Sequence, residues 1–449
     1  MGRRTITCAA IVVAAAAALP SPAQAQAQRG AASADMTFWR SLGDTTLTRL
    51  ITSALGANRD LRGAEARIQA ARAARTDAAL DLAPAVTANA GYSRQRMSSA
   101  MVPGAIGRPP EQGLWDAGLQ LAWEVDVFGR GRRSLQARSA LVASAEEDAL
   151  DAGVIVAAEV ARAYLELRGI QQRLAVGRQN AENQRRTLEL TLARLEAGSG
   201  TALDTERAQA QLSSTLAGIP MLESAIEAER HRLAVLIGMP PTAEGVQLAN
   251  ATQPLLLPEE LALERPDVVV RQRADVRGSA SRSEAGSALV SAAKAGYLPR
   301  ISIAAAAGYT SSELDALGNT GSPRYVVGPV ISWPLFDLGR VKTDVDEARA
   351  REAELNAQHE QLVLSALAEI ETSRAGYHSA RTRLHHLEEA AAASERATEL
   401  ARLRFEEGGT GFLEVLDTER RQLEAQDRLA DGRTQAAHWL VSVYKAHAH

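Results

Sequence analysis

Few residues in this sequence have the types and spacing that chemistry requires. His385, His386 and Glu389 occur together in the run HHLEE, and His385 and Glu389 are one helical turn apart, so both could contact one metal ion. Zinc sites need three or four convergent ligands, whereas the rest of this run is typical of a polar helix face. The chain also has no G-x-S-x-G, no phosphate-binding glycine loop and no H-E-x-x-H motif. We therefore expect no metal, no cofactor and no enzymatic activity.

A second group of charged residues lies in LEVLDTER at 413–420. Leu413 and Asp417 are spaced i, i+4, and Arg420 follows Asp417 by three residues, so all three lie close to one helical face. Considered alone, Asp417 and Arg420 are most simply a solvated surface pair, which contributes less than about 1 kcal/mol.

The overall composition narrows the class of protein. The net charge is −4, and no basic stripe stands out, so we expect no nucleic-acid partner. Aromatic residues are only 4% of the chain and alanine is abundant. This balance favours long helices that pack closely through small side chains.

The N-terminus has the pattern of a secretory signal peptide. Arg3 and Arg4 precede an apolar run that ends near Leu19, and small residues follow, with cleavage expected after Ala25 or Ala27. Cys8 is the only cysteine and lies inside this segment, so the mature protein should have no disulfide. No later stretch is apolar enough to span a bilayer as a helix, so any crossing would use β-strands.

The chain reads as two copies of one unit. WEVDVFGR at 123–130 resembles WPLFDLGR at 333–340, and the shared Gly-Arg pairs lie 210 residues apart (339 − 129). The same offset joins two further pairs beyond the phrases. The matching residues are Trp123 and Trp333, Gly129 and Gly339, Arg130 and Arg340, Arg194 and Arg404, and Gly198 and Gly408. A fixed offset over such a distance indicates an internal duplication.

Each of these two motifs lies at the start of a long helical run. No proline occurs between Pro110 and Pro220 or after Pro334, and apolar residues recur there at helical spacing. The first run, from Arg130 to Ala197, would be about 100 Å long if unbroken. Glycines at 153, 169 and 177 could bend or interrupt it. GSG at 198–200 and GGTG at 408–411 end the two runs, and a second helix follows each.

A sequence pattern typical of β-strands precedes each long helical run. Polar and apolar residues alternate over 86–93, 119–126, 301–310 and 325–333, with a polar loop from Arg94 to Gly113 in the first copy. Segments of about ten residues with this period are typical of outer-membrane strands. The competing interpretation is a pair of ordinary half-buried hairpins in a soluble domain.

Four strands cannot close a transmembrane barrel, and open edges in lipid leave backbone groups unpaired. Several chains must then share one barrel. Two chains would give about eight strands and three would give about twelve, and the polar strand faces favour the wider, wet interior of the trimer. Trp123 and Trp333 would lie near the membrane interface, where each strand ends and each helix begins.

The ordered motifs resemble the TolC-like outer-membrane efflux family, in particular its NodT/OprM-type branch. They are ERPDV at 264–268, AGYLPRIS at 295–302, WPLFDLGR at 333–340 and RFEEGGTGFLEVLDTER at 404–420, and the resemblance covers essentially the whole mature chain. It implies a mainly α protein with transmembrane β-structure, a homotrimer whose 12-stranded β-barrel continues into a periplasmic α-helical barrel. It also implies an exit duct of a tripartite RND efflux system in the outer membrane, with a periplasmic adaptor and an inner-membrane transporter as partners.

The resemblance assigns roles to two groups of residues. Arg194, Gly198, Arg404 and Gly408 lie at the hairpin tips that would contact the adaptor. Leu413 would form an apolar periplasmic gate and Asp417 a ring of three carboxylates, while Arg420 would pair with a neighbouring acid, for which we choose Asp204. One departure is clear: Thr5-Ile6-Thr7 before Cys8 is not a lipobox, so we expect no N-terminal lipid.

These observations divide the chain into seven segments. We expect a signal peptide at 1–27, an N-terminal equatorial segment and first helix at 28–84, a first transmembrane β-hairpin at 85–128, a first long helical hairpin at 129–238, an equatorial linker and helix at 239–296, a second transmembrane β-hairpin at 297–338, and a second long helical hairpin with a C-terminal equatorial segment at 339–449. The alternative functions are a periplasmic coiled-coil adaptor or scaffold and an exported enzyme. An adaptor would usually have one hairpin inserted into β-rich domains, not two tandem copies.

Overall fold

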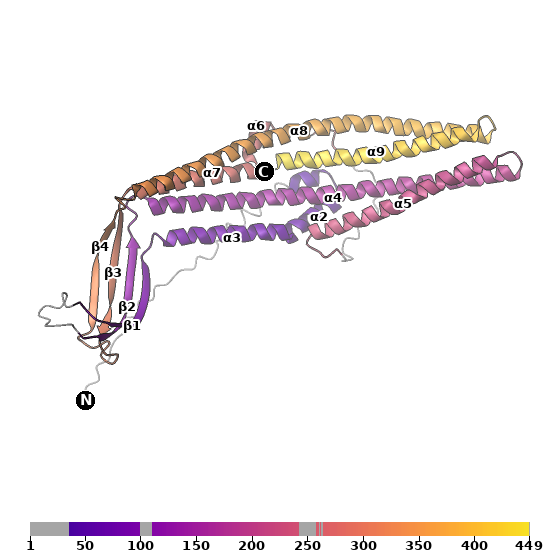
Figure 1. Cartoon of the computed structure of the whole chain (residues 1–449). Helices are drawn as coiled ribbons and strands as arrows, with labels where there is room; N and C mark the ends of the chain where they lie inside the picture. Colours follow the sequence, from indigo (N-terminus) through magenta and orange to yellow (C-terminus); the bar gives the residue numbers. More distant parts are fainter. Residues whose placement is uncertain (1–35, 99–109, 242–256, 260, 262–263, 449) are drawn as a thin grey trace.

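The computed structural model describes residues 36–98, 110–241, 257–259, 261 and 264–448. The signal peptide, its cleavage sites and Cys8 lie outside these residues. The molecule is elongated, with a small sheet at one end and long helices that run away from it (Figure 1). The strands are β1 (Ala85–Gln95), β2 (Gln112–Glu124), β3 (Arg300–Ser311) and β4 (Pro323–Ser332).

The four strands form one antiparallel sheet in the order β1-β2-β3-β4. All four predicted strands are present, but the loop predicted from Arg94 to Gly113 is shorter, because Arg94 pairs with Gly113 and Gln95 with Gln112. The two hairpins join through β2 and β3, where Gly118 lies opposite Gly308. A Cβ atom on Gly118 would lie 2.7 Å from the Ala307 carbonyl oxygen, so this close approach needs glycine.

The sheet has little packing of its own. Every residue of β1 is exposed, and so is nearly every residue of β4. These two strands are also the edges of the sheet, so each presents one unpaired row of backbone groups within the chain. Within the chain the sheet is therefore open at both edges.

Each copy contributes three main helices. The first copy has α3 (Arg59–Leu80), α4 (Arg130–Glu196) and α5 (Ala202–Leu236), and the second has α7 (Ala274–Lys294), α8 (Leu338–Glu406) and α9 (Phe412–His447). α4 packs against α3 and α7 near the sheet and against α5 and α9 farther away (Figure 1). We call α4 with α5 the first hairpin and α8 with α9 the second hairpin.

The 67-residue helix α4 runs without a break through Gly153, Gly169 and Gly177, so the interruption considered from the sequence does not occur. Gly169 has a packing role instead. A Cβ atom at this position would lie 2.0 Å from the Thr434 hydroxyl oxygen of α9, so glycine lets the two helices approach closely. Pro220 lies inside α5.

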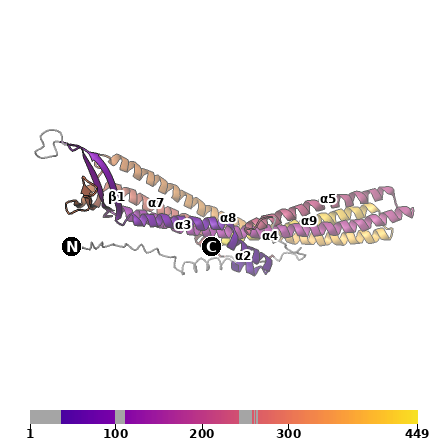
Figure 2. The ribbon, with the colours of Figure 1, turned by 90° about the horizontal axis from the view of Figure 1, so that it is seen from below.

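The main apolar core lies near the middle of the molecule, where the short helix α2 (Thr45–Ala57) packs on α4 (Figure 2). Trp39, Ile51, Val160, Leu233 and Val441 are fully buried in it. Across the part of the chain that the structure describes, no helix is both long and apolar enough to cross a membrane.

A repeated contact fastens each copy at this level. Asn58 precedes α3, and its side-chain amide donates to the Leu236 carbonyl oxygen at the end of α5 (2.9 Å). Arg273 follows α6 (Pro266–Gln272) and precedes α7, and its guanidinium donates to the Ala446 carbonyl oxygen at the end of α9 (3.3 Å). Both donor side chains are buried. The duplication thus extends from sequence phrases to individual contacts.

Candidate functional site

The two helical hairpins end in the same turn. Gly198 and Gly408 adopt positive φ angles of 72° and 78°. The N–H of Gly198 donates to the Leu195 carbonyl oxygen and that of Gly408 to the Phe405 carbonyl oxygen, each at 3.0 Å. This is the left-handed ending that glycine permits at a helix C-terminus.

The two tip arginines differ sharply. Arg194 reaches from the first hairpin to the second, where its Nη2 donates to the carbonyl oxygens of Phe405 (2.7 Å) and Glu406 (3.3 Å). Its guanidinium carbon lies 3.9 Å from the centre of the Phe405 ring. Arg404 is exposed, and its side chain forms no hydrogen bond or ion pair with the other residues that the structure describes. Matching positions therefore have different surroundings within one chain.

The predicted gate residues lie at the start of α9. The Leu413 side chain is 59% exposed. Asp417 is bonded to two arginines of its own helix, Arg420 at 3.0 Å and Arg421 at 2.8 Å. Leu413 and Asp417 also line a shallow, open hollow. An exposed leucine beside a carboxylate has the character of a pore constriction, but this role stays a prediction.

The predicted pair of Arg420 and Asp204 does not form within the chain. Asp204 lies in the first turn of α5, where Thr201 caps the helix. The Thr201 hydroxyl donates to the Asp204 carboxylate (2.7 Å), and the Asp204 N–H donates back to that hydroxyl (3.2 Å). Reciprocal capping of this kind stabilises a helix start and explains the acid locally.

Two residues of the first hairpin occupy positions that match the predicted gate residues. Leu203 lies 210 residues before Leu413 and is 58% exposed, so each copy presents one leucine just beyond its tip turn. Arg207 is exposed and matches Asp417 at the same offset. The duplication itself was the signal that could have found both residues, had the offset been followed past the turns.

The junction residues lie from the end of β2 to the start of α4 and from the end of β4 to the start of α8, and the two tryptophans make equivalent contacts. The Trp123 indole N–H donates to the Leu82 carbonyl oxygen (2.9 Å), and that of Trp333 donates to the Tyr297 carbonyl oxygen (3.1 Å). Each carbonyl lies three residues before the first strand of its hairpin. Each indole therefore ties the end of a β-hairpin to its beginning.

The helix starts beside these tryptophans differ. Gly129 has φ of 80° and precedes α4, whereas Gly339 lies in the first turn of α8, which begins at Leu338. Arg130 forms a forked pair with Glu124, at 3.0 and 2.9 Å from its Nη2. Arg340 instead pairs with Asp337 (3.0 Å).

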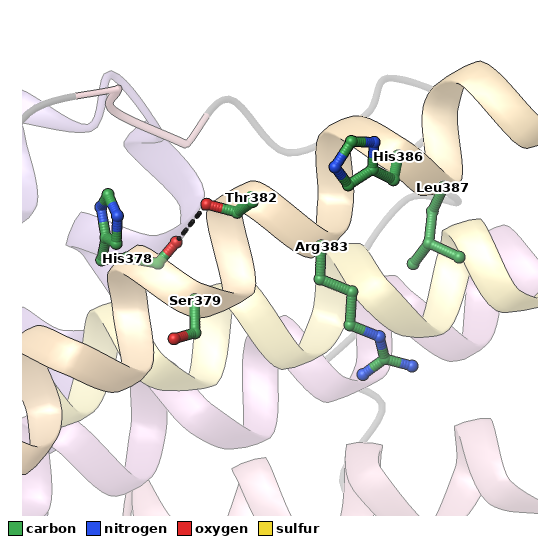
Figure 3. Close-up of a pocket in the computed structure, with 6 residues that line it drawn as sticks. All are labelled: His378, Ser379, Thr382, Arg383, His386 and Leu387. Atoms are coloured by element: carbon green, nitrogen blue, oxygen red, sulfur yellow. Dashed lines mark hydrogen bonds between the residues drawn. The ribbon is translucent and has the colours of Figure 1, made fainter.

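The histidine cluster lies on the open surface of α8. His386 is 3.2 Å and His385 is 3.5 Å from Glu389, and all three side chains are more than 60% exposed. Figure 3 shows a neighbouring shallow hollow, in which the His378 and His386 rings project on one side of the helix and Arg383 on the other. Among the described residues, no group of three or more His, Cys, Asp or Glu side chains is placed to hold a metal ion.

The family model described as "Outer membrane efflux protein" matches residues 50–239 and 266–449. The chain belongs to this family. The efflux protein is 30% identical over 420 residues to the outer membrane protein OprJ of Pseudomonas aeruginosa, covering 93% of this chain and 87% of that protein. It is 26% identical to nodulation protein T of Rhizobium leguminosarum bv. viciae, covering 89% of this chain and 81% of that protein.

Solved structures agree with this assignment. The outer-membrane channel OprN shares 36% identity with a TM-score of 0.86, and the match covers 92% of each chain. The outer membrane protein VceC of Vibrio cholerae, at 24% identity, shows the same fold with a TM-score of 0.83 over 91% of this chain and 98% of that one. The family resemblance, the fold class and the outer-membrane location predicted from the sequence are thus confirmed. The family is described as outer membrane efflux proteins, and OprN as an outer-membrane channel.

Proposed function

We propose that this efflux protein is the exit duct of a tripartite pump, through which small molecules pass passively across the outer membrane. The observation that carries this proposal is the exposed four-stranded sheet with two open edges, continued by long helices. An adaptor or scaffold would not need such a sheet, so that alternative is not favoured.

The open edges support a homotrimer. An unpaired strand edge in lipid costs several kcal/mol for each backbone group, so β1 and β4 need partners from other copies. Three copies would close about twelve strands around a lumen, whereas two would close a barrel of about eight that side chains fill. The helices would continue this wall into the periplasm.

The tips are the proposed site for the periplasmic adaptor. Gly198 and Gly408 are exposed at the far ends of the hairpins, and their turns present backbone rather than bulky side chains. Arg194 and Arg404 flank these turns, where Nη2 of Arg194 is hydrogen-bonded to the second hairpin and its guanidinium lies over the Phe405 ring. The inner-membrane transporter would supply the energy, since the chain has no phosphate-binding motif.

The gate is proposed to lie just beyond the tips. Leu413 and its matching residue Leu203 would give the closed tube an apolar constriction with two leucines from each chain. Asp417 would add a ring of carboxylates that favours cations over anions. Its pairs with Arg420 and Arg421 would hold the carboxylate in place and moderate its charge.

The mass of the complex, extracted from outer membranes in mild detergent, tests this function. We expect light scattering, corrected for detergent, to give the mass of three chains, and the complex to form ion-conducting pores in a planar bilayer. A soluble monomer would contradict the duct and return the scaffold to first place. A trimer that never conducts would retain the shared barrel but contradict a passive channel.

A further inference from the structure

The contact between the two hairpins of one chain is a template for a contact between chains. Within the chain, α4 of the first hairpin packs against α9 of the second, and α5 and α8 lie on the two outer sides (Figure 1). Near the tips, Leu190 of α4 packs against a cluster that contains Phe405, Phe412 and Val415 of the second hairpin. Arg194 completes this contact through the Phe405 and Glu406 carbonyl oxygens.

The second hairpin carries the matching donor side without a matching acceptor in its own chain. Leu400 lies 210 residues after Leu190, and its side chain is 62% exposed. Arg404 matches Arg194 and is exposed. In one repeat the apolar residue and the arginine are in contact with the other hairpin, and in the other repeat both are exposed. This difference indicates a surface that a second chain covers.

We propose that Arg404 binds the α4 tip of a neighbouring copy of this chain in the way that Arg194 binds the α8 tip of its own. The Arg404 guanidinium lies over the side chain of Leu195 of the neighbouring copy and donates to the carbonyl oxygens of Leu195 and Glu196. This inference rests on the homotrimer of the proposed function. It adds the residues that join one copy to the next at the periplasmic mouth.

The acceptor side has the required chemistry. Leu195 and Glu196 are exposed and end α4, where carbonyl groups without helical partners carry the negative end of the helix dipole. The Leu195 oxygen accepts the Gly198 N–H at 3.0 Å. The Phe405 oxygen likewise accepts the Gly408 N–H at 3.0 Å and still accepts Arg194. A carbonyl oxygen in this turn can therefore serve two donors.

The contact within a chain is stronger than the proposed contact between chains, and this difference would allow the periplasmic mouth to open. Arg194 stacks on an aromatic ring, whereas Arg404 would lie over the aliphatic Leu195, so the contact between copies lacks the cation–π interaction. Three stronger contacts within chains and three weaker ones between chains would alternate around the mouth. Widening then begins at the seams between copies, and each chain moves with its two hairpins together.

Cysteine cross-linking tests the contact directly, because the only native cysteine, Cys8, lies in the predicted signal peptide. The doubly substituted variant Arg404→Cys with Leu195→Cys is treated, as the detergent-extracted complex, with a short bis-maleimide. We expect covalent dimers and trimers on a denaturing gel. The matched pair Arg194→Cys with Phe405→Cys should be bridged within one chain and run as a monomer, and each single variant should also run as a monomer.

Two results would overturn the inference. One is a complex with the mass of three chains in which the 404–195 pair is not bridged or is bridged only within a chain, which leaves the proposed function intact. The other is a complex that is not a trimer, which defeats both.

In planar bilayers, Arg404→Ala should raise the open fraction of the channel several-fold, and Arg404→Lys, which keeps the charge without the fork, should lie between. An unchanged open fraction in Arg404→Ala would contradict the role of the seam in opening.

Discussion

The two copies of the repeat share the contacts that hold each copy together and differ at the tips of their hairpins. Both copies tie the β-hairpin through a tryptophan indole, and both fasten the return helix through a buried side chain before α3 or α7. The tip arginines and the residues at 207 and 417 have diverged in partner or charge. Contacts that hold one copy together recur because each copy must solve the same packing problem. The side chains at the tips are not under that constraint, and they differ.

The buried side chain that precedes α3 or α7 makes the same kind of backbone contact in both copies, but in the second copy it also forms ion pairs. Asn58 makes its hydrogen bonds with backbone groups, whereas Arg273 also pairs with Asp275 (2.8 Å) and Glu369 (2.9 Å). Burial opposes ionisation of Asp275 and Glu369, but hydrogen bonds from Arg273 to both, a bond from Lys445 to Glu369 and the positive charges of the two bases outweigh it and hold the pKa of each carboxyl below its usual value. The second copy thus joins α7, α8 and α9 by charge.

The largest expected effect on stability comes from replacing Arg273 of the second copy by asparagine, the residue type that makes this contact in the first copy. Arg273→Asn should lower the stability by about 3–5 kcal/mol, because it leaves partly buried carboxylates without their main partner. Asn58→Ala, the matched control, should cost about 1–3 kcal/mol. The midpoint of thermal unfolding, followed by helical circular dichroism in detergent, measures both. Equal losses would show that the charge adds nothing to the shared contact.

A second comparison concerns the charge that each copy presents beyond its tip. If Asp417 and Arg207 lie at the same level of the closed tube, Asp417→Asn should abolish most of the preference for cations, and Arg207→Gln should increase it several-fold. Reversal potentials across a planar bilayer in a potassium chloride gradient measure this preference. If neither substitution changes the reversal potential, the constriction lies elsewhere.

The two glycines at the helix starts should respond oppositely to alanine. Gly129→Ala places a Cβ at a φ of 80° and should cost about 1–2 kcal/mol. Gly339→Ala meets open space in a helical turn and should be neutral or stabilise the protein by up to about 1 kcal/mol. Thermal midpoints compared side by side decide this, and a loss for Gly339→Ala as large as that for Gly129→Ala would argue against the difference in backbone conformation.

The smallest expected effect is a dependence on acid at one contact, between Glu166 of α4 and His438 of α9, that has no counterpart at the matching position of the second copy. Glu166 accepts from His438 Nε2 at 2.7 Å, and this hydrogen bond outweighs burial and lowers the pKa of Glu166, whereas the matching position is Gly376. A lowered folded-state pKa stabilises the protein above the ordinary glutamate value, and that contribution is lost as the pH falls through the lowered value.

Glu166→Gln should therefore lower the thermal midpoint at about pH 7 and have less effect at about pH 4. Glu223→Gln is the control, since Glu223 forms an exposed pair with Arg178, which contributes little. A Glu166→Gln variant that loses the same stability at both values would show that the interaction does not depend on the ionised carboxylate.

Local patterns accounted for much of the fold. Alternation of polar and apolar residues located all four strands, and glycine after a long helical run located both tips. The strand ends were less well predicted, because the polar residues at 94–95 and 112–113 pair across the hairpin although their sequence resembles a loop. The preference of Asp204 for Thr201 was missed because a capping bond competes with any long-range partner.

The sequence alone determined the duplicated plan, the family and the positions of the strands, helices and turns, since these depend on neighbours a few residues away or on a constant offset of 210. Only the tertiary structure decided that Arg194 is engaged while Arg404 is exposed, and that Gly129 is left-handed while Gly339 is helical. The difference between the two arginines arises from residues that lie far apart in the chain and close together in space, and the difference between the two glycines is one of backbone conformation. Identical residue types at matching positions cannot reveal them, because the partners differ while the residues do not.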